Sequence, residues 1–131
     1  MKQRLKAMLG LALVGGALTQ ITLPAFAEEI DWHQVPGTLE RFDGFGTQVW
    51  LIGTNTIARN GDAINFDLME DMHFSYRRIA GNCRTGWMNS ITSGYYDETG
   101  EIVIERRTPE SLQVQHNKID LSLQFACDLS E

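Results

Sequence analysis

Three ionisable side chains stand close together in the segment Glu70-Asp71-Met72-His73. Two carboxylates beside an imidazole could hold a divalent metal weakly, or the carboxylate–imidazole pair could supply a general base. The same residue types are common at solvent-exposed hairpin corners, and catalytic groups usually come from several parts of a chain. The chain also lacks a Gly-x-Ser-x-Gly nucleophile elbow. We therefore expect no catalytic residue, no metal site and no cofactor.

A second group combines arginines with aromatic residues between positions 76 and 96. Arginine beside tryptophan and tyrosine is typical of the residues that dominate binding energy at protein interfaces. The same composition is expected on a sheet face where aromatic side chains pair across strands and arginines balance charge. Alternation along a strand sends Arg77 and Arg78 to opposite faces, so at least one must meet solvent or a charged partner. The candidate interface consists of Tyr76, Arg77, Arg84, Trp87, Tyr95 and Tyr96.

Cys83 and Cys127 are the only cysteines in the chain. In an oxidising compartment such a pair is expected to be bridged rather than free. A zinc site would need four ligands, and neither cysteine has a Cys or His neighbour at finger spacing. Closing a loop of about 45 residues would contribute about 4 kcal/mol on the chain-entropy argument. We therefore predict a Cys83–Cys127 disulfide.

The first 27 residues have the composition of a secretory signal peptide. Basic residues at positions 2, 4 and 6 precede an apolar run over 7–23, and Pro24-Ala25-Phe26-Ala27 supplies an Ala-x-Ala ending. Glycines and polar residues interrupt the apolar run, which disfavours a stable membrane-spanning helix. We expect cleavage after position 27 and an exported product, periplasmic or secreted, with no stable membrane insertion.

Residues 28–131 would then form one strongly acidic domain. The whole chain has a net charge of −6, and removal of the leader would leave eight basic against 17 acidic residues, hence −9. A chain this acidic lacks the basic surface of a nucleic-acid binder, and anionic lipid would repel it. We therefore expect no nucleic-acid partner. A positively charged partner would suit this charge, although the charge alone does not indicate one.

These residues must be positioned by strands, whose pattern is clearest over 47–83. Asn60-Gly61 lies between two alternating segments, which is the strongest local signal for a hairpin with a type I′ turn. Within 62–69 alternate residues are apolar, as in a half-buried strand that directs Ile64, Phe66 and Leu68 to one face. Runs of the same kind predict further strands over 48–52, 54–59 (after a bulge at Gly53), 73–79, 84–96 and 101–106.

Consecutive strands with short loops predict one antiparallel meander sheet of about five strands, in a mainly-β or α+β fold. The C-terminal element is ambiguous. Thr108-Pro109-Glu110 has the residue types of a helix start, but alternate apolar residues over 119–127 favour a last hairpin around 116–118. The local pattern favours strands in 111–127, with a helix as the alternative. The disulfide would tie either one back to the sheet.

Short motifs occur in a characteristic order along nearly all of residues 28–131: Trp32, Val49–Ile52, Thr56-Ile57-x-Arg59-x-Gly61, Ser75-Tyr76, Cys83-Arg84, Pro109-x-Ser111 and Leu123-x-Phe125-Ala126-Cys127. In this order they resemble the surface-adhesin protein E family of small exported bacterial proteins. The resemblance implies an antiparallel sheet with a short C-terminal helix tied back by a Cys–Cys bridge. It also implies binding to extracellular-matrix or plasma proteins, and haem binding is known in the family. The family's adhesive residues lie outside these motifs, so the resemblance implies no site residue here.

We therefore expect an exported, non-enzymatic binding protein of adhesin E type, whose partner is a protein such as an extracellular-matrix or envelope component. Two alternatives stay open. One is a small periplasmic enzyme, or a metal or haem carrier, that uses Glu70, Asp71 and His73. The other is a structural envelope protein that self-associates, for example as a homodimer, by pairing of exposed strand edges.

Overall fold

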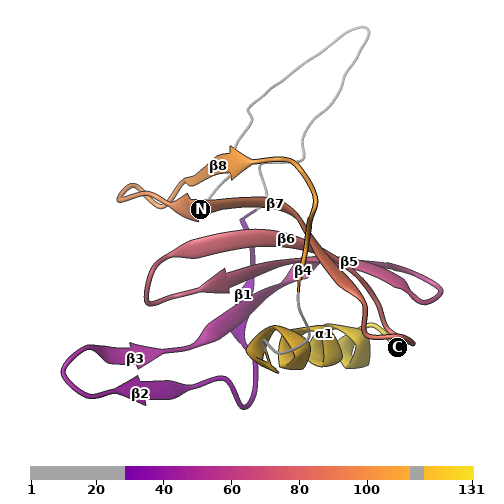
Figure 1. The fold of residues 1–131 in the computed structure, drawn as a ribbon, viewed down its shortest axis with the longest axis horizontal. Coiled ribbons are helices and arrows are strands. Elements are labelled where there is room, and N and C mark those ends of the chain that lie inside the picture. The colour runs from indigo at the N-terminus through magenta and orange to yellow at the C-terminus, as the bar shows by residue number, and fades with distance from the viewer. Residues whose placement is uncertain (1–28, 113–116) are drawn as a thin grey trace, which may run out of the picture.

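A computed structural model of the chain describes residues 29–112 and 117–131. These residues form one main antiparallel sheet, a small separate hairpin and one helix (Figure 1). The strands of the main sheet lie in the order β1 (Trp32–Gln34), β4 (Trp50–Asn60), β5 (Ala63–Glu70), β6 (Ser75–Asn82), β7 (Met88–Tyr96) and β8 (Ile102–Arg106), and β9 (Glu110–Ser111) also pairs with β7. The separate hairpin consists of β2 (Glu40–Phe42) and β3 (Gly46–Gln48), and the helix α1 spans Asn117–Leu129.

The predicted meander of about five strands is confirmed, because β4 to β8 are neighbours both in sequence and in the sheet. The predicted hairpin is also present, but its turn lies one residue later than expected. Asn60 pairs with Ala63, so that Gly61 and Asp62 are the central residues. Gly61 has a φ of 65°. A positive φ at the first central position alone is the type II′ geometry, so the predicted type I′ turn is wrong.

The hydrophobic core lies between α1 and one face of the sheet. Strand β5 buries Ile64, Phe66 and Leu68 there, as its alternation predicted. The helix packs against β4 and β5 (Figure 1). Its buried residues include Ile119 and Leu123, which are one helical turn apart. The helix therefore covers the part of this face that β4 and β5 form.

The C-terminal element is a helix, so the hairpin favoured by local alternation is wrong. Ile119, Leu123 and Ala126 face the core, while the intervening apolar residues Leu121 and Phe125 are only partly buried against it. A wide apolar stripe on a helix places apolar residues at alternate positions by chance, which imitates a strand. The helix agrees with what the family resemblance implied. The predicted signal peptide and the segment 113–116 lie outside the described residues.

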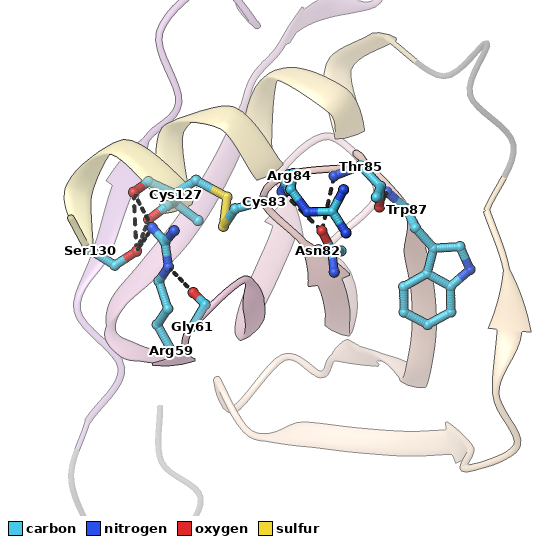
Figure 2. Close-up of a disulfide and its surroundings, with 10 residues drawn as sticks. Arg59, Gly61, Asn82, Cys83, Arg84, Thr85, Trp87, Cys127 and Ser130 are labelled. Atoms are coloured by element: carbon cyan, nitrogen blue, oxygen red, sulfur yellow. Dashed lines mark hydrogen bonds between the residues drawn. A yellow bond between two sulfur atoms is a disulfide. The ribbon is translucent and has the colours of Figure 1, made fainter.

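Strands β6 and β7 begin later than predicted, each for a local reason. Strand β6 begins at Ser75 because Phe74 adopts a left-handed φ of 57°, which breaks the extended chain. Strand β7 begins at Met88 because the preceding residues form a turn. In that turn Asn82 Oδ1 accepts hydrogen bonds from the backbone N–H groups of Arg84 and Thr85, both at 2.9 Å (Figure 2).

The predicted disulfide is present and joins Cys83, just after β6, to Cys127 in α1, with a Cα–Cα distance of 5.8 Å. Arg59 of β4 supports the same helix end: its Nη1 donates to the Cys127 carbonyl at 3.0 Å and its Nε to the Gly61 carbonyl at 2.8 Å (Figure 2). Helix α1 has no basic residue of its own in its last turn. Arg59 therefore supplies the positive charge that a helix C-terminus favours. Among the described residues, no helix combines the length and the apolar character needed to cross a membrane.

Candidate functional site

The sheet face that does not contact α1, which we call the open face, carries the candidate site. Paired positions in antiparallel strands project from the same face. Because β5 directs its alternate apolar residues to α1, the intervening Asp67 projects from the open face. Four further residues pair with Asp67 directly or through a neighbouring strand, and they therefore lie in one row across the sheet. They are Trp32 of β1, Gly53 of β4, Arg78 of β6 and Thr92 of β7.

The open face is concave. Strands β1 and β7 are four positions apart in the sheet, which corresponds to about 19 Å in a flat sheet and exceeds what two side chains can span. The rings of Trp32 on β1 and Tyr96 on β7 nevertheless make an edge-to-face contact, with centroids 5.8 Å apart. Register shifts in the β4–β5, β6–β7 and β7–β8 pairs accompany this curvature. Bulges of this kind bend strands and increase their twist.

Two glycines allow close approach at two of these bulges. A Cβ atom on Gly53 would lie 2.5 Å from the Ile30 side chain. A Cβ atom on Gly94 would overlap the backbone carbonyl oxygen of Val103 on the neighbouring strand. A side chain at position 53 would displace the Ile30 side chain, whereas one at position 94 would push the backbone of β8 away, so the close approach of β7 and β8 depends on Gly94.

A buried ion pair lies in the middle of the open face. Arg78 Nε donates to Asp67 Oδ1 at 2.8 Å, and the Asp67 side chain is 2% exposed whereas that of Arg78 is 42% exposed. The hydroxyl group of the buried Tyr76 interacts with both charged groups. Burial raises the pKa of the Asp67 carboxyl, and the Arg78 guanidinium offsets this only in part. Burial, together with the nearby Asp67 charge, also raises the pKa of the Tyr76 phenol.

Tyrosine and tryptophan rings pack against one another beside this ion pair. Tyr96 contacts Tyr76 as well as Trp32, with ring centroids 6.5 Å apart and planes inclined at 68°. Edge-to-face pairs of this kind stabilise the packing beyond the area they bury. The Tyr96 hydroxyl oxygen is buried beside Trp32 but makes no hydrogen bond of ordinary geometry to any described residue. Burial raises the pKa of this phenol, so Tyr96 remains a neutral hydrogen-bonding group.

A groove of about 730 Å³ opens next to these rings. Its walls come from β1, from the end of β5 and the turn that follows, and from the end of β7 and its following loop. Side chains from segments far apart in sequence therefore meet at one end of the open face. The groove is lined by Trp32, Met69, Phe74, Tyr96, Asp97, Glu98 and Gly100.

Phe74 is the most unusual residue of the groove. The residue is 57% exposed and its φ is 57°, a conformation that is uncommon for a bulky side chain. The Phe74 carbonyl oxygen accepts a hydrogen bond from the Tyr96 backbone N–H at 2.9 Å. This bond joins the β5–β6 turn to the end of β7. The fold thus holds an exposed aromatic ring at the groove in a strained backbone conformation, which is a common property of functional sites.

Two acidic residues form the rim. Asp97 Oδ1 accepts three hydrogen bonds within its own turn, two from Thr99 and one from the backbone N–H of Glu101, at 2.6 to 3.0 Å. These bonds, led by that from the Thr99 hydroxyl, lower the pKa of Asp97. Glu98 is exposed, and its carboxylate has no hydrogen-bond or ion-pair partner among the described residues. The rim therefore carries one fixed and one unengaged negative charge.

The six residues of the predicted interface do not form one surface. Tyr76 and Tyr96 lie together on the open face. Arg77 pairs with the core residue Leu68, and Tyr95 pairs with Ser75, so both project from the face that α1 covers in part. Arg84 and Trp87 lie beside the disulfide in the turn between β6 and β7, at the opposite end of these strands from the other four (Figure 2).

Sequence reasoning missed most of the residues that line the groove or support it. Asp67 and Arg78 carry a detectable signal, because an acidic and a basic residue face each other across the β5–β6 hairpin once the turn is placed correctly. The contributions of Phe74 and of the Asp97 turn depend on backbone geometry and on curvature of the whole sheet. No local pattern indicates them.

The acidic cluster considered for metal binding is used to build a turn. Glu70 accepts a hydrogen bond from the His73 backbone N–H at 3.0 Å and lies 2.8 Å from His73 Nδ1. Asp71 Oδ1 accepts a hydrogen bond from the Val49 backbone N–H at 2.9 Å. Within 29–112 and 117–131, no three or more His, Cys, Asp or Glu side chains are grouped to hold a metal ion. Both carboxylates therefore have a structural explanation.

The open face thus combines a formed groove, exposed aromatic surface and an acidic rim. These features suit non-covalent recognition of another molecule, since large aromatic side chains in partly desolvated pockets dominate binding energy at interfaces. We compared the chain with protein-family models, with curated proteins and with solved structures, and none of them matches it.

Proposed function

We propose that this chain is an exported, non-enzymatic binding protein of adhesin E type, and that the groove on its open face receives a protein partner. The observation that carries the proposal is Phe74, an exposed aromatic ring that a strained backbone holds at the mouth of the groove. Nothing in the packing of the core requires this ring at the surface. A binding role explains why the fold accepts the strain.

The architecture supports the same proposal. A meander sheet with a C-terminal helix tied back by Cys83–Cys127 agrees with the arrangement that the family resemblance implies. A disulfide is typical of a protein that folds outside the cytoplasm, which supports export. The partner would be an extracellular-matrix protein or a component of the cell envelope.

The proposal is tested with Phe74→Asn, because asparagine tolerates the left-handed conformation that this position adopts. The matched control is Phe45→Asn, at a phenylalanine that is 82% exposed in the turn between β2 and β3 and does not line the groove. Each protein is immobilised and exposed to purified matrix proteins and to envelope extract, and the retained partner is measured by surface plasmon resonance. We expect the native chain and the control to retain the same partner, and Phe74→Asn to bind at least tenfold more weakly, as for loss of a central aromatic anchor. Retention of no partner, or equal retention by all three proteins, would contradict the proposal.

Self-association through a strand edge is a second candidate, favoured by one observation. Among the described strands β8 pairs only with β7, so its other edge is available at the rim of the sheet (Figure 1). This edge is rich in β-branched residues, namely Ile102, Val103 and Ile104. Such an edge can pair with a second copy of the chain to give a homodimer. Light scattering of the purified protein tests this candidate, and a monomer at all concentrations would exclude it.

A further inference from the structure

We propose that the groove on the open face binds a cationic side chain, a lysine or an arginine presented by a basic segment of the partner. This inference rests on the proposed function and names the chemistry of the partner. It follows from the charge of the rim and from the aromatic walls of the groove.

The charge of the groove has one sign. Both of its charged lining residues in the described part of the chain, Asp97 and Glu98, are acidic. Arg78 lies on the same face but is already paired with Asp67. An anionic ligand would therefore meet only repulsion at the rim. The whole chain, with a net charge of −6, would attract a basic segment from a distance.

The two rim carboxylates have different roles. Hydrogen bonds within the turn fix the position of Asp97 through its Oδ1 atom. Glu98 makes no such bonds among the described residues, so its carboxylate is available to an incoming ammonium or guanidinium group. The Asp97 carboxylate is thus held in position before a ligand binds, and the Glu98 carboxylate can move towards the bound ligand.

The walls suit a cation as well as an apolar group. Trp32, Phe74 and Tyr96 bring three aromatic rings to the groove, and the faces of such rings attract cations. Met69 adds a polarisable surface for the aliphatic part of a lysine or arginine side chain. A purely apolar ligand would leave both rim carboxylates without a role.

The test uses NMR spectroscopy of the isotope-labelled protein, with its tryptophan indole N–H signals as reporters. Trp32 lines the groove, Trp50 is buried in the core and Trp87 is exposed beside the disulfide, so two of the three signals are internal controls. The probes are capped glycine pentapeptides with a central arginine, lysine, norleucine or glutamate. We expect the arginine and lysine peptides to shift the Trp32 signal saturably, with the Trp87 signal unchanged. The norleucine and glutamate peptides should bind clearly more weakly.

A pair of variants separates the local charge from the net charge. Glu98→Gln should weaken the binding of the arginine peptide about two- to fivefold, the range expected for an exposed ion pair. Glu105→Gln removes the same charge from an exposed position on β8 that does not line the groove, and it should leave the affinity unchanged. Equal binding of the norleucine and arginine peptides, or equal effects of the two variants, would overturn the inference.

The failure of this inference differs from the failure of the proposed function. If Phe74→Asn abolishes retention of a protein partner but no cationic peptide shifts the Trp32 signal, the cation assignment is wrong and the binding role stands. If the cationic peptides bind as expected but no protein partner is retained, the cation assignment is supported and the protein-binding role is contradicted.

Discussion

Asp67 and Arg78 occupy directly opposed positions on β5 and β6, and Arg78 Nε lies 2.8 Å from Asp67 Oδ1. The carboxylate is almost completely buried, while the guanidinium reaches solvent. The two partners are therefore not equivalent. Removal of the arginine would leave a buried charge without compensation, whereas removal of the aspartate would leave an arginine that water can still solvate.

Arg78→Met should therefore destabilise the fold by about 3 kcal/mol near neutral pH. This loss of stability should be smaller at low pH. Without the arginine, burial raises the pKa of Asp67 in the folded state further above its unfolded value of about 3.9. At a pH between the unfolded and the folded pKa, the folded state therefore binds more protons than the unfolded state. Stability then falls as the pH rises through this window, and the penalty is smallest below about pH 4. Denaturant unfolding of the variant and the native protein at each pH measures the difference.

The double variant Asp67→Asn/Arg78→Met provides the control. It removes the buried charge together with its partner, so Asp67 can no longer titrate, and the extra loss of stability that Arg78→Met shows as the pH rises from about 4 to 7 should be absent. A single variant Arg78→Met with the same loss at every pH would show that Asp67 does not carry the effect.

The curvature of the sheet should depend on Gly94. A Cβ atom there would overlap the backbone carbonyl of Val103, and backbone cannot move aside as a side chain can. We expect Gly94→Ala to cost about 3 kcal/mol, near the upper end of ordinary single substitutions. Gly44→Ala is the comparison, because Gly44 has a φ of 80° with open space around it and should lose only about 1 kcal/mol. Equal losses in thermal unfolding would mean that the close approach at Gly94 is unimportant.

Local patterns predict the central sheet well. The alternation of Ile64, Phe66 and Leu68 and the Asn-Gly signal both reflect the β4–β5 hairpin, and the two cysteines suffice to predict the bridge. The C-terminal helix is missed because its wide apolar stripe also satisfies a period of two. A helix of 13 residues is stabilised by packing on the sheet, which no local window contains.

The groove is harder to predict than the strands. A strand predicted from His73 misplaces the β5–β6 turn, and this shift of register hides the pairing of Asp67 with Arg78. The contact of Trp32 with Tyr96 joins strands four positions apart and arises only when the whole sheet curves. The predicted interface had the correct composition for part of this face. Strand alternation and the late start of β7 then divided its residues among three surfaces.

Arg59 should stabilise the helix end that the disulfide anchors. Its guanidinium donates to the carbonyl of Cys127 at the C-terminal end of α1, where no basic residue of the helix itself is present (Figure 2). We expect Arg59→Ala to lower the free energy of unfolding by about 1 to 2 kcal/mol, as for a charge-assisted hydrogen bond. Arg41→Ala, at an exposed arginine of β2, should change it by less than about 0.5 kcal/mol. Similar losses for both variants in urea unfolding would assign no special role to Arg59.

The last prediction concerns Phe74 and separates stability from binding. Phe74→Asn removes an exposed ring but also relieves a left-handed conformation that disfavours phenylalanine by about 1 to 2 kcal/mol. Phe74 is 57% exposed, so the packing energy lost with its ring is partial and of the same order. We therefore expect a change in stability of less than about 1 kcal/mol, whereas binding to the partner should be lost. Urea unfolding and the retention assay on the same preparation measure both quantities. A variant that unfolds much more easily than the native chain would make Phe74 a structural residue, and the strain at this position would then need an explanation other than binding.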